Sequence, residues 1–371
     1  MSKALSRTLA LVAALLLAGG LVSDAAASAP QTFADAKKLA DAEGQPLLLK
    51  VGTSWCKSCK KFDQTVETEA EFRSSITDHA VLYTVDAEAG EGVDVARTYH
   101  VAGYPTFVLM NSDGEMMDCW MGFHHQSEFT DSMDKALSDP TTVAEKLERF
   151  REDPSATDAL KLGDLRQYQG MSAEAVAYYQ RAQVLDPDRD VDYDLRVFGA
   201  MARGSWGQLF TTEDVVKQAD AVYASSPTAP GMLEVMYTMK KISHKTEQPA
   251  LWHPYLKQTV EAAGNFPDDE KFTKKVAWYK PDYALHIEKD VDKAIRYRKD
   301  VMPEDWLQDA NQLNNFAWWC FENDVNLEEA DAMARRGIDL AEAGKQKANI
   351  LDTLAEICNA RDDCEHAVEY I

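Results

Sequence analysis

Two cysteines, Cys56 and Cys59, lie two residues apart in the segment WCKSCK. If this segment begins a helix, the spacing puts the sulfurs one turn apart, close enough to form and reopen a disulfide. Cys56 would then lie at the helix N-terminus, where unpaired N–H groups and the helix dipole favour a thiolate, the attacking species in thiol–disulfide exchange. The spacing predicts that Cys56 attacks and that Cys59, one turn deeper, resolves the mixed disulfide.

Four lysines surround this pair in an otherwise acidic chain: Lys50, Lys57, Lys60 and Lys61. Their charge should favour a low pKa for Cys56. A CxxC pair can also bind a metal, but further soft ligands would be needed, and the sequence has no second CxxC or paired His/Cys motif. The adjacent His124 and His125 follow a predicted strand and are interpreted as surface residues. The pattern favours redox chemistry without a metal, and no cofactor beyond the Cys56–Cys59 disulfide is expected.

Helix and strand patterns alternate around the pair. The sequence predicts helices over 33–44, 56–66, part of 93–101 and 127–137, and strands over 46–51, 80–87, 105–110 and 115–122. Gly44 should close the first helix, Asp113-Gly114 should form a turn between the last two strands, and Ser127 should cap the last helix. Such alternation is typical of an α/β layered fold.

Together these residues resemble the thioredoxin superfamily. WCKSCK follows a buried strand and opens a helix, as WCxxCK does in that family, and GYPTF (103–107) stands where the family carries its cis-proline loop. The resemblance covers about 33–137 and implies a thioredoxin-like domain over 30–138 in which Pro105 is cis and faces the cysteines. It also implies a set of residues that bind or support the substrate: Trp55, Lys57, Tyr104, Pro105 and Thr106. In the family, the backbone before the proline, here that of Tyr104, binds an incoming peptide strand.

One residue departs from the family pattern. The family usually buries an Asp six residues before the first cysteine, and here that position is Lys50. A buried cation is costly unless it snorkels or contacts the thiolate, so proton handling is expected to differ from that of relatives. The segment VDAEAGEG (85–92) and the YPTF loop look most like periplasmic thioredoxin-like domains. That likeness implies protein thiols or disulfides as substrates and a membrane thiol carrier as electron donor.

The first residues have the pattern of an export signal. Lys3 and Arg7 precede an apolar run over 9–22, and small residues follow at 25–27, so we expect cleavage of a signal peptide over 1–27 and a periplasmic or secreted protein. An uncleaved anchor is the alternative. The whole chain has a formal charge of -23, and removal of 1–27 leaves -24. Such an acidic chain argues against nucleic-acid binding.

After Pro140 the strand patterns end, and amphipathic stretches alternate with prolines as far as Ile371. An all-α helical-repeat domain is therefore predicted over 141–371. Residues 156–189 match a tetratricopeptide pattern at these positions: Ala159, Leu162, Gly163, Ala175, Tyr179, Ala182 and Pro187. Within 310–371, LNNFAWWC (313–320) and LDTLAEIC (351–358) match in phase. A helical bundle without repeats remains the alternative.

The other cysteines have simpler interpretations. Cys119 lies in a predicted strand, and Cys320 and Cys358 occupy matching repeat positions, so all three are expected in cores. Cys358 could also form a structural disulfide with Cys364, and the sequence leaves both arrangements open.

These observations predict an exported enzyme, a thiol–disulfide oxidoreductase acting as a reductase or isomerase, whose helical repeats bind a protein partner. The alternative is a scaffold or chaperone-like adaptor in which the cysteine pair is only a structural disulfide. The direction of electron flow is not determined by the KS dipeptide between the cysteines.

Overall fold

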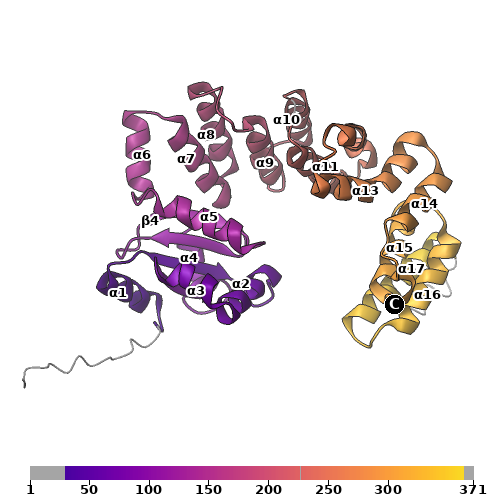
Figure 1. Ribbon diagram of the computed structural model, residues 1–371, viewed down its shortest axis with the longest axis horizontal. Helices are drawn as coiled ribbons and strands as arrows, with labels where there is room; N and C mark the ends of the chain where they lie inside the picture. The colour runs from indigo at the N-terminus through magenta and orange to yellow at the C-terminus, as the bar shows by residue number, and fades with distance from the viewer. Residues whose placement is uncertain (1–29, 226, 363–371) are drawn as a thin grey trace, which may run out of the picture. The chain divides into compact units, whose positions relative to one another are not determined.

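A computed structural model describes residues 30–225 and 227–362 of the chain. The described part divides into two compact units: one runs up to Pro154 and includes Tyr168–Gly170, and the other comprises Ser155–Gln167 and the residues from Met171. The first unit contains a sheet and helices, and the described part of the second contains only helices (Figure 1). The predicted succession of an α/β unit and an all-α region is therefore confirmed. The predicted signal peptide and Cys364 lie outside the described residues.

The sheet of the first unit has four strands in the order β2-β1-β3-β4. They are β1 (Leu47–Gly52), β2 (Val81–Asp86), β3 (Thr106–Met110) and β4 (Met116–Met121). β1 runs parallel to β2 and antiparallel to β3, and β3 and β4 form the predicted hairpin. Gly114 turns this hairpin at a φ of 87°, a conformation that favours glycine. β1 is therefore a central strand, hydrogen-bonded on both sides.

Six helices accompany the sheet in this unit: α1 (Phe33–Glu43), α2 (Lys57–Thr68), α3 (Ala70–Thr77), α4 (Gly92–Thr98), α5 (Gln126–Leu137) and α6 (Val143–Glu152). Gly44 ends α1 in the left-handed conformation, as predicted. The predicted cap at Ser127 is wrong, because α5 already begins at Gln126 and its N-cap is His125, whose side chain accepts no capping hydrogen bond. α3 was not predicted as a separate helix; the extended backbone of Glu69 separates it from α2.

The two faces of β1 contact different layers. Leu47, Leu49 and Val51 point to one face and are fully buried. Leu48 and Lys50 point to the opposite face, because side chains alternate along a strand. That face packs on a cluster of aromatic rings: Phe62, Phe72, Phe107, Trp120, Phe123 and Phe129. α2, which follows the cysteine motif, is held to the sheet through Phe62.

The helices of the second unit follow one another along the chain (Figure 1). They are α7 (Ala156–Tyr168), α8 (Ser172–Leu185), α9 (Tyr193–Ser205), α10 (Thr212–Ala224), α11 (Ala229–Lys245), α12 (His253–Glu261), α13 (Glu270–Tyr283), α14 (Val291–Asp300), α15 (Ala310–Glu322), α16 (Leu327–Leu340) and α17 (Lys345–Ala360). Short turns accompany them at Pro249–Trp252, Ala262–Asn265, Ala284–Glu288 and Trp306–Gln308. Most of these helices pack on the next helix along the chain, which fits a helical-repeat region.

Prolines mark several of these helix boundaries, with one exception. Pro230 and Pro254 lie in the first turns of α11 and α12, where the missing N–H costs no helical hydrogen bond. Pro281 was expected to break the chain between helices but lies inside α13. The helix continues for two residues and then widens into a π-turn over Ala284–Glu288. Because proline has no N–H, the carbonyl of Ala277, four residues earlier, receives no helical hydrogen bond from position 281.

The first predicted repeat is a helical hairpin of α7 and α8. Ala159, Leu162, Ala175 and Ala182 are buried. A side chain on Gly163 would come within 2.5 Å of the ring of Tyr179, so the two helices approach closely where glycine stands. Within 310–371, Phe316 and Cys320 of α15 share one core with Leu354 and Cys358 of α17.

Candidate active site

Cys56 and Cys59 lie where β1 gives way to α2. Cys56 is the N-cap residue of α2, and its Sγ accepts a hydrogen bond from the Cys59 N–H at 3.1 Å. The sulfurs form a disulfide across a Cα–Cα distance of 5.2 Å. The first cysteine therefore lies among the free N–H groups of a helix start, the environment that favours a thiolate after reduction.

The disulfide is largely covered. The exposed fraction is 6% for Cys56 and 2% for Cys59, so Cys56 is the more exposed of the two by a small margin. Trp55 is 62% exposed, and Lys57, the first residue of α2, is also exposed. A client would therefore meet the indole and the helix start before it reached a sulfur.

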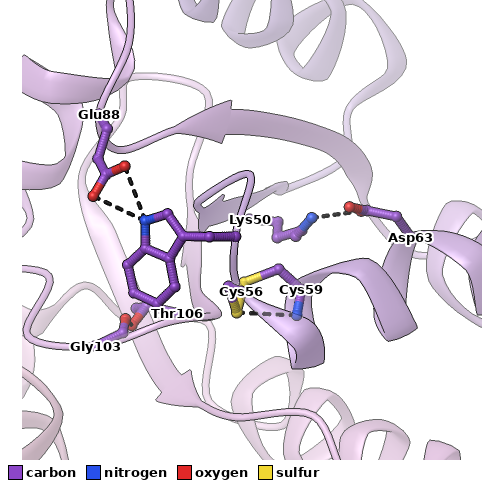
Figure 2. The surroundings of a disulfide bond; sticks show 8 residues. Lys50, Cys56, Cys59, Asp63, Glu88, Gly103 and Thr106 are labelled. Carbon is purple, nitrogen blue, oxygen red and sulfur yellow. Dashed lines mark hydrogen bonds and ion pairs between the residues drawn. A yellow bond between two sulfur atoms is a disulfide. The ribbon is translucent and has the colours of Figure 1, made fainter. Parts of the chain in front are cut away.

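The GYPTF loop lies at the same end of the sheet. The Tyr104–Pro105 peptide bond is cis, as the resemblance implied. Thr106 begins β3 opposite Val51 of β1, and its Oγ1 donates to the Gly103 carbonyl at 2.7 Å. Figure 2 shows Gly103 and Thr106 near the cysteines. The rings of Trp55 and Tyr104 meet edge to face at 6.0 Å, which links the cysteine motif to the proline loop.

Comparison with known proteins identifies the family to which the region around the cysteine pair is similar. Residues 33–137 match the family model described as a thioredoxin-like domain. These residues form a thioredoxin-like domain. The match to the family covers this domain and not the helical region.

Individual relatives match the same part of the chain. The thiol:disulfide interchange protein DsbD of Cronobacter sakazakii is 32% identical over 80 residues, which are 21% of this chain and 14% of that protein. DsbD of Escherichia coli strain K12 is 29% identical over 98 residues, which are 26% of this chain and 16% of that protein. The solution structure of a proposed disulphide-isomerase from Bacteroides thetaiotaomicron is 28% identical, covers 29% of this chain and 88% of that one, and has a TM-score of 0.26. The chain thus matches less than a fifth of the length of the two DsbD proteins.

Lys50 is buried beneath the disulfide of the thioredoxin-like domain. Its Nζ donates to Oδ1 of Asp63 at 2.5 Å and lies 5.7 Å from the centre of the Phe62 ring (Figure 2). Transfer of an ammonium group from water costs several kcal/mol unless a counter-charge is present, and Asp63 supplies it. Lys50 does not snorkel to the surface.

The other lysines of the predicted cluster point elsewhere. Lys60 is exposed, and Nζ of Lys61 donates to the carbonyl of His124 at 2.5 Å. His124 and His125 are both exposed, as expected for surface residues. Among residues 30–225 and 227–362, no three His, Cys, Asp or Glu side chains gather in an arrangement able to hold a metal ion.

Three residues of the site were not predicted from the sequence. Glu88 accepts hydrogen bonds from the Trp55 indole, Asp63 pairs with Lys50, and Gly52 leaves room for the Cys59 sulfur. Asp63 lies four residues after Cys59, a spacing that places both on one side of α2 and could have identified it. Glu88 lies within the 85–92 segment, but its partner is 33 residues away in sequence.

The three other cysteines that the structure describes are buried. Cys119 lies in β4, and Cys320 and Cys358 lie in the core of α15–α17. Burial raises the pKa of Cys320 to about 12, so this thiol is protonated at neutral pH. The proposed Cys358–Cys364 disulfide involves a residue outside the described ranges.

A separate groove lies between α11 and α13 of the second unit. Its volume is about 560 Å³. Its lining combines aromatic and basic side chains, among them Tyr237, Phe272, Trp278, Tyr279, Lys271 and Lys275. Tyr237 and Trp278 are exposed.

Of the chain that the structure describes, no helix is both long enough and apolar enough to span a bilayer.

Proposed function

We propose that this protein is an exported thiol–disulfide oxidoreductase that acts on protein disulfides through Cys56 and Cys59, as a reductase or isomerase. The observation that carries the proposal is the Cys56–Cys59 disulfide at the start of α2, next to an exposed indole and a cis-proline loop. A structural disulfide would not need this arrangement around it.

The reduced pair would transfer two electrons in two exchanges. The Cys56 thiolate attacks one sulfur of a client disulfide, forms a bond to it, and releases the other client sulfur as a thiolate. The Cys59 thiolate then attacks Cys56 Sγ, so that the Cys56–Cys59 bond forms and the bond to the client breaks. The client disulfide ends as two thiols after proton uptake from water, and the enzyme pair ends oxidised.

Tyr104, Pro105 and Thr106 would present backbone to the client strand, with Trp55 and Lys57 beside it. This role is supported by the position of Tyr104, which precedes the first residue of β3 and whose ring meets that of Trp55, next to Cys56, at 6.0 Å. We propose a membrane thiol carrier as electron donor, which the likeness of the 85–92 segment and the YPTF loop to periplasmic thioredoxin-like domains implies.

The helical unit would bind a protein partner and bring it to the redox pair. The groove between α11 and α13 supports this role because it exposes Tyr237 and Trp278, residue types that commonly anchor protein interfaces. The tetratricopeptide assignment of 156–189 and 310–371 belongs to this proposal. Export rests on residues 1–27, and processing of the expressed precursor to a periplasmic form that lacks them would test it.

The activity is tested with insulin. The chain without residues 1–27 should accelerate reduction of insulin disulfides by a small thiol, and Cys56→Ser should abolish the acceleration. Unchanged activity in Cys56→Ser would refute the mechanism. Cys59→Ser should accumulate mixed disulfides through Cys56, and their absence would show that Cys59 does not resolve them.

The rival function is a non-catalytic scaffold or adaptor with a structural disulfide. The reduction potential separates the two, because structural disulfides generally lie below about -300 mV and catalytic ones are more easily reduced. The direction is tested by alkylation trapping in cells. A mainly reduced pair supports a reductase or isomerase, and a mainly oxidised pair indicates a disulfide donor.

A further inference from the structure

Lys50 carries a charge into the interior of the thioredoxin-like domain. It lies on the central strand β1, opposite Thr84 of β2 and Phe107 of β3. Its side chain is 3% exposed, whereas that of its partner Asp63 is 54% exposed. The charge of Lys50 is therefore buried, and that of Asp63 is partly solvated.

The end of the Lys50 side chain and the Cys59 sulfur border the same small space beside Gly52. A first side-chain carbon on Gly52 would lie 3.0 Å from Cys59 Sγ and 3.4 Å from Lys50 Cε. Because both atoms border the same small space, the sulfur lies no farther from Cε than these two distances together. Glycine at position 52 leaves no side chain between them. Figure 2 shows Lys50 running past Cys59 towards Asp63.

This proximity matters when the disulfide is reduced. While the disulfide is intact, the charges of Lys50 and Asp63 balance and the sulfurs are neutral. To attack Cys56 Sγ, Cys59 must first lose its proton, and the resulting thiolate is buried, since Cys59 is 2% exposed. An anion in such surroundings is disfavoured unless a cation lies close to it. Lys50 is the cation that the structure places there.

We propose that Lys50 is a positioning residue whose buried ammonium stabilises the Cys59 thiolate, and that Asp63 both orients this ammonium and weakens its effect. The inference rests on the proposed function for its role in client turnover. In the resolving step, the Cys59 thiolate forms a bond to Cys56 Sγ and the bond between Cys56 and the client sulfur breaks. The client leaves as a thiolate and takes a proton from water. Over the two exchanges together, the enzyme pair loses two electrons and the client disulfide gains them.

The proposal predicts opposite effects from the two partners of the ion pair. Lys50→Met removes the cation while keeping an unbranched side chain, so the reduced pair, in which the cation stabilises the Cys59 thiolate, should become less favourable relative to the disulfide. Asp63→Asn removes the anion that offsets it, so the dithiol form should become more favourable. A purely structural role would not produce opposite signs, because either substitution breaks the same contact. Lys135→Met is the matched control, since it removes one lysine from the exposed surface of α5.

The experiment is a redox titration of the chain without residues 1–27 against glutathione at pH 7, read by alkylation and mass spectrometry. We expect Lys50→Met to shift the equilibrium constant about tenfold towards the disulfide, a change of about 30 mV for two electrons. We expect Asp63→Asn to shift it several-fold towards the dithiol and Lys135→Met to leave it within about twofold. If Lys50→Met stays within twofold of the wild type, or if both partners shift it in the same direction, the proposal is wrong.

Two further measurements keep the test decisive. Should Lys50→Met fail to fold, Asp63→Asn alone decides, because its substituted side chain is half exposed; no shift towards the dithiol would overturn the proposal. In single turnover with a disulfide peptide, Lys50→Met should prolong the lifetime of the mixed disulfide on Cys56 about tenfold. The titration contains no client, so it can fail while insulin reduction succeeds, and the converse result would refute the proposed function alone.

Discussion

The indole Nε1 of Trp55 donates hydrogen bonds to both carboxylate oxygens of Glu88, at 3.1 and 3.0 Å. The indole is exposed, yet this contact and the edge of Tyr104 hold it in one orientation. Glu88 lies in the loop between β2 and α4. This loop, which is distant in sequence from the cysteine motif, therefore fixes the orientation in which Trp55 faces a client.

Glu88→Ala should therefore weaken client binding more than turnover. Ordering one released side chain on binding costs about 0.5–1.5 kcal/mol, or roughly 2- to 13-fold in affinity. We expect KM for insulin to rise within that range while kcat stays within about twofold of the wild type, measured by steady-state kinetics.

The matched variant is Glu88→Gln, whose amide oxygen can still accept from the indole. Its KM should rise by less than about twofold. A fall in kcat without a change in KM for Glu88→Ala would contradict a role in orienting Trp55.

Phe62 is the central ring of the aromatic cluster beneath the cysteine helix. It contacts Phe72, Phe107, Phe123 and Phe129 at centroid distances of 4.8–5.9 Å. Phe62→Ala should destabilise the domain by about 3–5 kcal/mol, because truncation of a buried ring leaves a cavity. Hydrogen exchange of the β1 and β3 amides should accelerate correspondingly. Val93→Ala on the exposed side of α4 should change stability by less than about 0.5 kcal/mol, and equal exchange in both variants would contradict the prediction.

Gly163 makes the contact between α7 and α8 possible. An added carbon would lie 2.5 and 2.7 Å from two ring atoms of Tyr179. That ring cannot easily move, since its hydroxyl bonds to Asp164 and Gln167 at 2.7 and 3.0 Å. Gly163→Ala should therefore destabilise the helical unit by about 1–3 kcal/mol, measured by urea unfolding followed by circular dichroism.

Gly199 in α9 is the matched control. The nearest atoms to an added carbon there lie 3.6 and 3.7 Å away, so the alanine fits. Gly199→Ala should stabilise the unit by about 0.5–1 kcal/mol, because alanine loses less backbone entropy in a helix. Changes of the same sign in both variants would show that the close approach of Tyr179 does not matter.

His253 and His286 stack with ring centroids 4.6 Å apart. Burial lowers the pKa of His253 to about 4, helped by the neighbouring His286 and Lys289 and opposed by Asp282. Burial also lowers the pKa of His286. Above an ordinary histidine pKa of about 6.5, both rings are neutral in the folded and unfolded states. As the pH falls from there towards 4, the unfolded chain binds protons that the folded chain does not, so stability is lost.

We therefore expect the urea midpoint of the helical unit to fall between pH 6.5 and 4. Carboxylates also titrate over this range, so the comparison is with His253→Gln, which should show a shallower fall. Parallel pH profiles for the two proteins would contradict the prediction.

Local patterns predicted much of the thioredoxin-like domain. The Cys56–Cys59 spacing, Gly44 and Asp113-Gly114 each determine backbone over three or four neighbouring residues, so no distant contact is needed to interpret them. The helix, strand and turn at these positions followed the prediction. The cap at Ser127 did not, because a helix can begin a residue earlier when its first turn packs well without a side-chain cap.

The contacts that tune the site could not be predicted in the same way. Trp55 and Glu88 are 33 residues apart, and Lys50 and Asp63 meet only because β1 places one residue beneath the helix that carries the other. Composition and short spacings thus predicted thiol–disulfide chemistry and the order of the two regions. The residues around each sulfur depend on strand register and on packing between layers. These bring together residues that are far apart in sequence, and their sequence separation alone does not predict the contact.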